Sequence, residues 1–484
     1  MLAQLEKRAT PATSAEAKRA RHLLVVLPKA DATGVPFADA LNVALERRKK
    51  KCDELAKAPL TTDLPHGAIA SWIIDDAARP LFERQTRIRK ALQPLLAEHP
   101  AEITICVYGT VAERRAAAQV AVYAAWVNGV VLPQHKKQSQ GEPLRRIRLY
   151  GDAAPDAYAA QRAKAEGNVL CRELTVLPPN ELTPGAYRTR VKALARHAGW
   201  KVEELDMRRL RKIGAGAFVA VAKGSEDEDA AIVRLMYRPR RAAKKIALVG
   251  KGICFDTGGH NLKPARYMAG MHEDMNGSAV ALGILHAAWQ ARLPVAIDCW
   301  LALAQNLISP RAYKQNDIVT ALNGTTIEIV HTDAEGRMVL ADTLTLAARE
   351  KPDLIVDFAT LTGSMHVALG DRYSGIFASS DEIAREALAA ARMSGERIAV
   401  FPMDDDYDEA LESQVADVKQ CTLEGGADHI LAARLLRRFT EDRPWIHMDL
   451  SGSSCKGGLG AVATDVTGFG VAWGYALLQS LVQS

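Results

Sequence analysis

Hydrophobic and polar positions in the first third of the chain follow two periods. Short β-type runs occur at Leu23 to Leu27, Ile103 to Tyr108 and Ile147 to Tyr150. Between them, apolar residues recur every three or four positions, which is typical of amphipathic helices. The helices are expected at Ala38 to Leu55, Pro80 to Gln93 and Val111 to Val127. This alternation predicts a small α/β domain.

The same alternation is stricter in the rest of the chain. Strands are predicted at Lys245 to Val249, Val295 to Leu303, Leu354 to Phe358, Ile398 to Phe401 and Trp445 to Leu450. Helices are predicted at Ser278 to Gln290, Met338 to Glu350 and Glu382 to Met393. Repeated strand and helix units favour a larger α/β domain with a mainly parallel central sheet flanked by helices.

Turn residues divide the chain. Asn323-Gly324 separates two β-type runs, residues 318–322 and 326–330, and predicts a hairpin because both turn positions tolerate φ > 0. The polar stretch 134–143 indicates an exposed loop. We predict a poorly ordered leader over residues 1–20, an N-terminal α/β domain over 21–165 and a C-terminal α/β domain over 166–484.

Composition excludes several classes of protein. Hydrophobic residues make up 48% and charged residues 25% of the 484 residues, as in a globular protein rather than a disordered one. Lys and Arg number 62 and Asp and Glu 57, so the net charge of +5 does not by itself indicate a nucleic-acid partner.

Cysteine spacing and apolar stretches indicate where in the cell the protein is expected. The seven cysteines form no C-x-x-C pair, which argues against a disulfide framework and a zinc finger. The longest apolar stretch, residues 116–132, contains Gln119 and Asn128 and is shorter than the ~20 residues of a membrane span. The first residues lack the apolar region of an export signal, so we expect a cytoplasmic protein without a membrane partner.

The densest group of polar residues directly follows the predicted strand ending at Val249. The segment GKGICFDTGGHNLKP contains Lys251, Asp256 and Lys263, and the residues MHEDMNG follow at a helix start. Loops at the carboxyl ends of strands line the clefts of open α/β sheets. A phosphate-binding loop is disfavoured, because G-x-x-x-x-G-K-[ST] is absent.

A second group, HTDAEGR, follows the predicted hairpin. If this segment is extended, Asp333, Glu335 and Arg337 project to the same side and form a site. Alternatively, the acidic residues only favour the dipole of the helix predicted from Met338. The segment alone supports both interpretations equally.

Together the two groups offer four carboxylates, from Asp256, Asp274, Asp333 and Glu335. Such a cluster needs cations, and oxygen ligands without a Cys or His cluster suit a pair of divalent ions. Two such ions balance the four negative charges. If Lys251 is a ligand it must be neutral, because an ammonium group has no free lone pair.

These segments resemble the leucyl aminopeptidases, also called cytosol aminopeptidases, which are dinuclear metallo-exopeptidases. The likeness extends through LPPNELTP, NLISPRAYKQNDIVTALNGTTIEIV and ATLTGSMHVALG, whereas residues 1–165 match only in size and pattern. The resemblance implies that residues 166–484 are a catalytic metallopeptidase domain. It further implies a metal-dependent aminopeptidase that hydrolyses the N-terminal peptide bond with a hydroxide activated by two metals.

The resemblance also assigns roles to residues. One metal would be held by Lys251, Asp256, Asp274 and Glu335, and the more exchangeable one by Asp256, Asp333 and Glu335. Lys263 would polarise the scissile carbonyl, and Arg337 would hold a bicarbonate ion as general base. The residues that would contact the substrate are Met271, Thr360, Leu361 and Gly363.

The resemblance implies zinc or manganese, with magnesium possible, peptide substrates with a free N-terminus and a homohexamer. His331 stands where the family signature NTDAEGR has Asn, but every ligand position is present.

The alternative to an aminopeptidase function is a DNA-binding regulator with incidental peptidase activity. It rests on three basic runs that could form a DNA-binding groove: residues 47–51, 208–212 and 238–241.

Overall fold

The computed structural model describes residues 1–31, 34–137, 141–156, 158–225 and 227–483, so residues 138–140 of the predicted loop lie outside the described residues. The chain forms two compact units. Unit 1 comprises residues 1–169, 392–396 and 455–467, and unit 2 comprises residues 170–391, 397–454 and 468–484.

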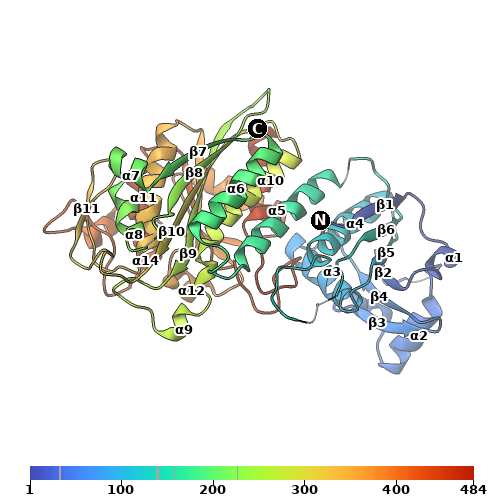
Figure 1. Ribbon diagram of the computed structural model, residues 1–484. Helices are drawn as coiled ribbons and strands as arrows, with labels where there is room; N and C mark the ends of the chain where they lie inside the picture. The colour runs from blue at the N-terminus through green and yellow to red at the C-terminus, as the bar shows by residue number, and fades with distance from the viewer. Residues whose placement is uncertain (32–33, 138–140, 157, 226, 484) are drawn as a thin grey trace. The chain divides into compact units, whose positions relative to one another are not determined.

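Unit 1 contains a six-stranded sheet of order β1-β6-β5-β2-β4-β3, in which only the β3–β4 pair is antiparallel. Helices α3 and α4 pack on one face of the sheet, and α1 and α2 contribute to the core on the other (Figure 1). The elements are β1 (Gln4–Arg8), α1 (Ser14–Ala17), β2 (His22–Leu27), α2 (Ala38–Arg47), η1 (Cys52–Ala56), β3 (Leu60–Leu64), β4 (Ala68–Ile74), α3 (Leu81–Leu96), β5 (Glu102–Val107), α4 (Val111–Asn128) and β6 (Arg146–Tyr150).

Two sequence predictions in unit 1 are corrected. The expected leader contains an ordered edge strand, β1, paired in parallel with β6, and α1, which starts in a capping box at Thr13. An edge strand with half-exposed alternation carries a weak hydrophobic signal, which explains the error. The helix predicted from Ala38 to Leu55 ends at Arg47, because like charges in the run that follows destabilise further turns.

Unit 2 contains an eight-stranded mixed sheet of order β15-β14-β17-β13-β9-β10-β8-β7. Its central strands β17, β13, β9 and β10 are parallel. The strands are β7 (Lys201–Asp206), β8 (Ala231–Tyr237), β9 (Lys245–Asp256), β10 (Ala296–Asn306), β13 (Leu354–Ala359), β14 (Ser374–Ala378), β15 (Ile398–Val400) and β17 (Trp445–Asp449).

Helices cover both faces of this sheet, which confirms the predicted fold class. Figure 1 shows α8, α11 and α14 on one side of the strands and α6 and α10 on the other. The remaining helices of the described chain are α5 (Ala159–Thr175), most of which belongs to unit 1, α6 (Pro184–Ala198), α7 (Met207–Ile213), α8 (Gly216–Ala222), α9 (Ala265–Met268), η2 (Met271–Met275), α10 (Asn276–Gln290), α11 (Glu335–Arg349), α12 (Gly363–Leu369), α13 (Asp381–Ser394), η3 (Asp405–Leu411), α14 (Asp428–Arg437) and α15 (Val471–Gln483). Among the described residues, no helix is both long and apolar enough to cross a bilayer.

The predicted hairpin is confirmed, but of its two predicted turn residues only Gly324, and not Asn323, has a positive φ. β11 (Ile318–Thr320) pairs antiparallel with β12 (Thr326–Glu328), and Gly324 adopts φ 93° in the turn. A short strand, β16 (Val418–Lys419), adds in parallel to β12. This small sheet brings residues around 420 next to the segment that leads from β12 into α11.

Strand β9 is longer than predicted, and this changes the place of two candidate residues. The sequence predicted a strand end at Val249, but the strand continues to Asp256. Gly250 allows this strand to approach α10, because an added Cβ would lie 2.4 Å from the Cα of Ser278. Lys251 and Asp256 are therefore strand residues rather than loop residues.

Candidate metal centre

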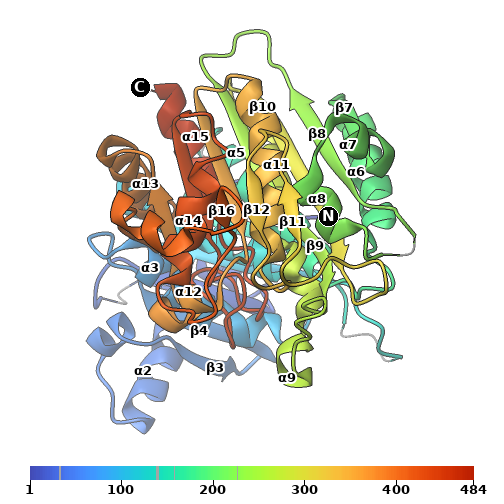
Figure 2. The same ribbon diagram turned by 90° about the vertical axis from the view of Figure 1, so that its left-hand side faces the viewer.

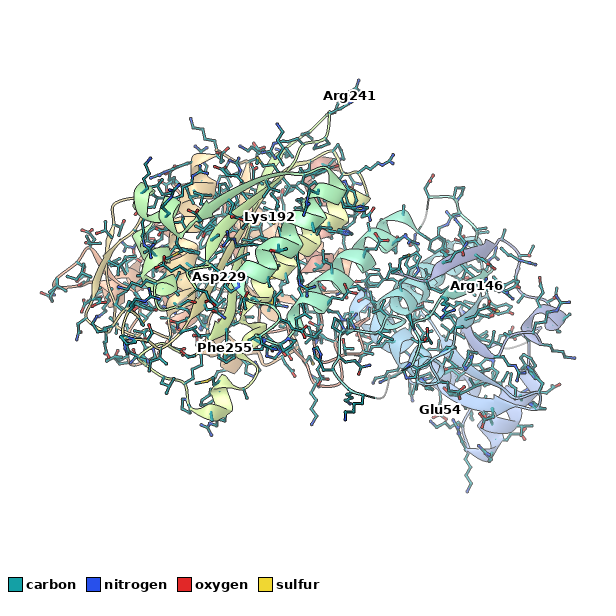
Figure 3. The ribbon with its side chains drawn as sticks, in the orientation of Figure 1. Glu54, Arg146, Lys192, Asp229, Arg241 and Phe255 are labelled. Atoms are coloured by element: carbon teal, nitrogen blue, oxygen red, sulfur yellow. The ribbon has the colours of Figure 1, made fainter. Side chains whose placement is uncertain are left out.

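Most candidate residues lie at one edge of the unit 2 sheet. Because β10, β9, β13 and β17 run parallel, their carboxyl ends share this edge. In Figures 1 and 2 it is the lower edge, near α9 and α12. Figure 3 labels Phe255 there, directly before the last residue of β9.

Asp256 ends β9 and is held from three sides. Its Oδ1 accepts hydrogen bonds of 2.8 Å from the backbone N–H of Gly258 and from Nδ2 of Asn306. Its Oδ2 lies 3.0 Å from Nζ of Lys263. Asn306 is positioned by a register irregularity at the end of β10, which pairs it with Asp256.

Asp274 comes from η2, which precedes α10. Its Oδ1 lies 2.8 Å from Nζ of Lys251 and accepts a hydrogen bond of 2.7 Å from the hydroxyl of Thr360. Its Oδ2 is buried and has no hydrogen-bond partner. One oxygen of this carboxylate is therefore available to a ligand.

Asp333 and Glu335 complete the cluster from the start of α11. Oδ1 of Asp333 lies 2.5 Å from Nζ of Lys263, and Oε1 of Glu335 lies 2.8 Å from Nζ of Lys251. Ligand oxygens of Asp256, Asp333 and Glu335 all lie within 4.8 Å of one another. The two sequence groups thus meet, as predicted.

Burial dominates the electrostatics of the cluster. The exposed fraction is 3% for Lys251 and 1% for Glu335. Burial is the main cause that raises the pKa of Asp256, Asp274 and Asp333, and neighbouring carboxylates add to it. Burial disfavours the charged forms of Lys251 and Lys263, but the carboxylates outweigh it and raise the pKa of both lysines.

The donor set fits divalent metal ions. Besides Oδ2 of Asp274, the oxygens Oδ1 of Asp333 and Oε1 of Glu335 are buried and accept no hydrogen bond of good geometry, although each lies close to a lysine nitrogen. Buried carboxylate oxygens need cations or donors. A cluster of hard oxygen donors suits divalent ions such as Mg²⁺ and Mn²⁺.

Three of the four candidate substrate residues follow β13, and one of them, Thr360, contacts the cluster. The carbonyl of Thr360 accepts a hydrogen bond of 2.9 Å from Nζ of Lys251. The N–H of Leu361 donates to Oδ1 of Asp449 at 3.0 Å, so this N–H already has a partner. Gly363 begins α12 in open space, and Met271 begins η2 and is half-buried.

The HTDAEGR segment is not extended, which corrects one of the two interpretations of it. α11 begins at Glu335, so Glu335 and Arg337 are helical and do not alternate with Asp333 on one side of a strand. Nη2 of Arg337 donates to both carboxylate oxygens of Asp428, at 2.9 and 3.0 Å, and Nη1 donates to the carbonyl of Gln420 at 3.0 Å. The acidic residues both join the cluster and lie at the helix start, so the two interpretations are not exclusive.

Sequence reasoning missed four polar residues at this edge: Asn306, Gln420, Asp428 and Asp449. Asn306 and Asp449 are the last residues of β10 and β17 and lie within three residues of the predicted strand ends, so their position near a carboxyl end was a usable signal. Gln420 and Asp428 follow no strand that the sequence predicted, so no sequence pattern placed them near the candidate site.

The basic runs proposed for DNA binding are partly neutralised by acidic residues. Arg209 lies 2.6 Å from Glu203, and Arg211 lies 2.7 Å from Glu228. Arg238 lies 2.6 Å from Asp298, while Figure 3 shows Arg241 projecting from the end of the β8–β9 loop. Nothing in the comparisons below supports the DNA-binding alternative.

Comparisons with known proteins agree on one family. A family model described as "Cytosol aminopeptidase family, catalytic domain" matches residues 169–473. The "Probable cytosol aminopeptidase" of Rhodopseudomonas palustris (strain BisB18) is 38% identical over 332 residues, which cover 68% of this chain and 65% of that protein. The protein of the same name from Acidovorax ebreus (strain TPSY) is 40% identical over 382 residues, which cover 78% of this chain and 76% of that protein.

A solved structure resembles almost the whole chain. The structure named "Bottromycin maturation enzyme BotP in complex with Mn" superposes with a TM-score of 0.83 at 29% sequence identity. It covers 96% of this chain and 100% of its own. The sequence alignment, by contrast, spans about two thirds of the length of the R. palustris relative.

Proposed function

The chain belongs to the cytosol aminopeptidase family, and from that premise we propose that it is a metal-dependent aminopeptidase acting on peptides with a free N-terminus. The observation that carries this proposal is the buried cluster of Asp256, Asp274, Asp333 and Glu335 around two lysines. Its carboxylates outnumber its cations, and several of their oxygens lack hydrogen bonds.

The ligands of two divalent ions come from this cluster. The family resemblance implies that Asp256 and Glu335 would contact both ions, and ligand oxygens of Asp256, Asp333 and Glu335 lie within 4.8 Å of one another. Asp274 would complete the first set together with Lys251, which would release its proton on binding the metal, and Asp333 would complete the second. When bound, the ions would anchor the substrate amine, polarise the scissile carbonyl and lower the pKa of the attacking water.

Lys263 supplies the positive charge beside the reacting carbonyl. Its ammonium group lies between Asp256 and Asp333, at 3.0 and 2.5 Å. Once those carboxylates bind metal, Lys263 can donate a hydrogen bond to the carbonyl oxygen. A fixed donor in a water-poor site stabilises the charge that develops there in the transition state.

Residues 360–363 position the substrate backbone. Asp449 fixes this segment, because it accepts from the N–H of Leu361 and from the hydroxyl of Thr362 at 2.7 Å. The backbone of Thr360 and Leu361 then lies beside the metal ligands, with Leu361 offering its carbonyl. Met271 and Gly363 border the pocket for the first side chain. An amine anchor restricts cleavage to the first peptide bond.

Two anions compete for Arg337. The family resemblance implies bicarbonate as general base, and Nε of Arg337, which is buried without a partner, supports an anion there. The carboxylate of Asp428 already occupies Nη2.

The family resemblance completes the proposal. It implies that the metal is zinc or manganese, with magnesium possible, that the protein forms a homohexamer and that it is located in the cytoplasm.

Turnover of aminoacyl amides tests the function. The protein loaded with Mn²⁺ or Zn²⁺ should hydrolyse them, lose activity with a chelator and reject N-acetylated substrates. Asp333→Ala and Glu335→Ala should abolish turnover. Asp408→Ala is the control, because Asp408 binds Arg434 at 2.7 Å elsewhere in unit 2. Full activity in the Asp333 and Glu335 variants would refute the site.

A further inference from the structure

Arg337 is a buried cation that contacts one carboxylate and one backbone carbonyl. Its side chain is 2% exposed. Nη2 lies within hydrogen-bond distance of both oxygens of one carboxylate, that of Asp428, while Nη1 donates to a backbone carbonyl. A fixed anion therefore accompanies this cation.

The backbone conformation at the start of α14 places Asp428 beside Arg337. Asp428 is the first residue of α14, where the helix dipole favours a negative charge. The preceding residue, Ala427, adopts the left-handed conformation with φ 54°, which is unusual for a residue other than glycine. The side chain of Asp428 remains 22% exposed, so small anions in solution can reach its surroundings.

Asp428 limits the access of dissolved anions to Arg337. An anion that approaches the Nη2 side of Arg337 meets a carboxylate already bound there, and a hydrogen bond between two charged groups is stronger than one between neutral groups. We propose that Asp428 is a positioning residue that supplies the permanent anion of Arg337, so that turnover does not depend on bicarbonate or another dissolved carboxylate. This inference rests on the proposed aminopeptidase function.

Removal and replacement of the anion test the proposal. In buffer depleted of carbon dioxide, added bicarbonate or formate should leave wild-type kcat unchanged. Asp428→Ala should lower kcat by about 10–100-fold, as is common when a residue that supports a metal site is lost, with a smaller effect on KM. Millimolar formate or bicarbonate should restore much of kcat, because each fits the vacated space beside Arg337.

Two further variants make the result specific. Asp428→Asn keeps the shape but removes the charge and fills the space, so formate should not rescue it. Asp408→Ala removes the carboxylate that pairs with a different arginine, Arg434 of α14, and its activity should respond to neither anion. Activation of the wild type by bicarbonate, or a folded Asp428→Ala variant that keeps full kcat or is not rescued, would overturn the proposal.

A second measurement separates this inference from the proposed function. Formate should raise the unfolding temperature of Asp428→Ala but not that of the wild type or of Asp408→Ala, because only the first has an unpaired buried guanidinium. This outcome requires no turnover. If no variant hydrolyses any peptide, the aminopeptidase proposal fails, and the stability measurement still decides whether Asp428 is the anion of Arg337.

Discussion

The side-chain amide of Gln420 donates a hydrogen bond of 3.1 Å from Nε2 to the backbone carbonyl of Ala334. Its Oε1 accepts from the N–H groups of Val330 and His331, at 2.9 and 3.1 Å. Gln420 is fully buried. One side chain thus fixes both ends of the segment that presents Asp333 to the candidate metal centre.

Gln420→Ala should weaken metal binding, because residues 330–334 would lose three hydrogen bonds. We expect Mn²⁺ affinity and turnover to fall by about 10–100-fold, the usual cost of losing support for a metal ligand. Metal titration of chelator-treated protein measures the affinity. Circular dichroism of the same samples tests whether the fold is retained, and an unchanged affinity in a folded variant would show that Gln420 does not position the ligands.

Metal removal should destabilise the protein. Without metal, Oδ2 of Asp274 is buried and unpaired. An ion that binds only the folded state raises the free energy of unfolding by about 2.7 kcal/mol at 100 times its dissociation constant. The unfolding temperature should therefore rise with Mn²⁺ concentration and fall with chelator, and Asp333→Ala should reduce this response. An equal response in both proteins would place the metal elsewhere.

The clustering of the candidate ligands could largely be predicted, because they are concentrated in two short segments. Asp256, Lys263, Asp333 and Glu335 lie in runs whose polar residues follow strands, and this signal does not depend on tertiary contacts. The extent of β9 was not predictable, because Gly250 in isolation indicates a turn. Only its packing against Ser278 shows why glycine occupies a strand there.

The residues that support the centre could not be predicted from the sequence. Gln420 follows a strand of only two residues, β16, which is too short to leave a hydrophobic pattern. Asp428 contacts Arg337, which lies far away in the sequence. Likewise, β1 depends on its partner β6 rather than on its own composition. Such features arise from pairing between distant segments.

Gly277→Ala should destabilise unit 2. An added Cβ would lie 2.1 Å from the carbonyl oxygen of Phe358, so the start of α10 would have to move away from β13. Overpacking of a buried contact costs about 1–3 kcal/mol. Gly426→Ala is the matched control, because no atom lies within 4 Å of its added Cβ. Urea unfolding of both variants with chelator present measures the difference, and equal stabilities would contradict the close approach.

His286 should make stability depend on pH in the acidic range. Burial, with a smaller effect of His197, lowers the pKa of His286 from 6.5 to about 4, and its Nδ1 has no hydrogen-bond partner. The unfolded chain therefore takes up this proton at a higher pH than the folded protein does. The resulting stability is present above pH 6.5 and is lost as the pH falls through about 4, to a total of about 3 kcal/mol.

His286→Phe should reduce that loss, because phenylalanine has no charged form and suits the contact with Trp289, whose ring centroid lies 5.5 Å away. Urea unfolding at pH 7.5 and 4.5, with metal removed, gives the change in the free energy of unfolding for each protein. The exposed His66 offers the control variant His66→Phe, which should keep the wild-type difference. If wild type and His286→Phe lose equal stability between the two pH values, His286 is protonated in the folded state without penalty, and its burial does not oppose the charge.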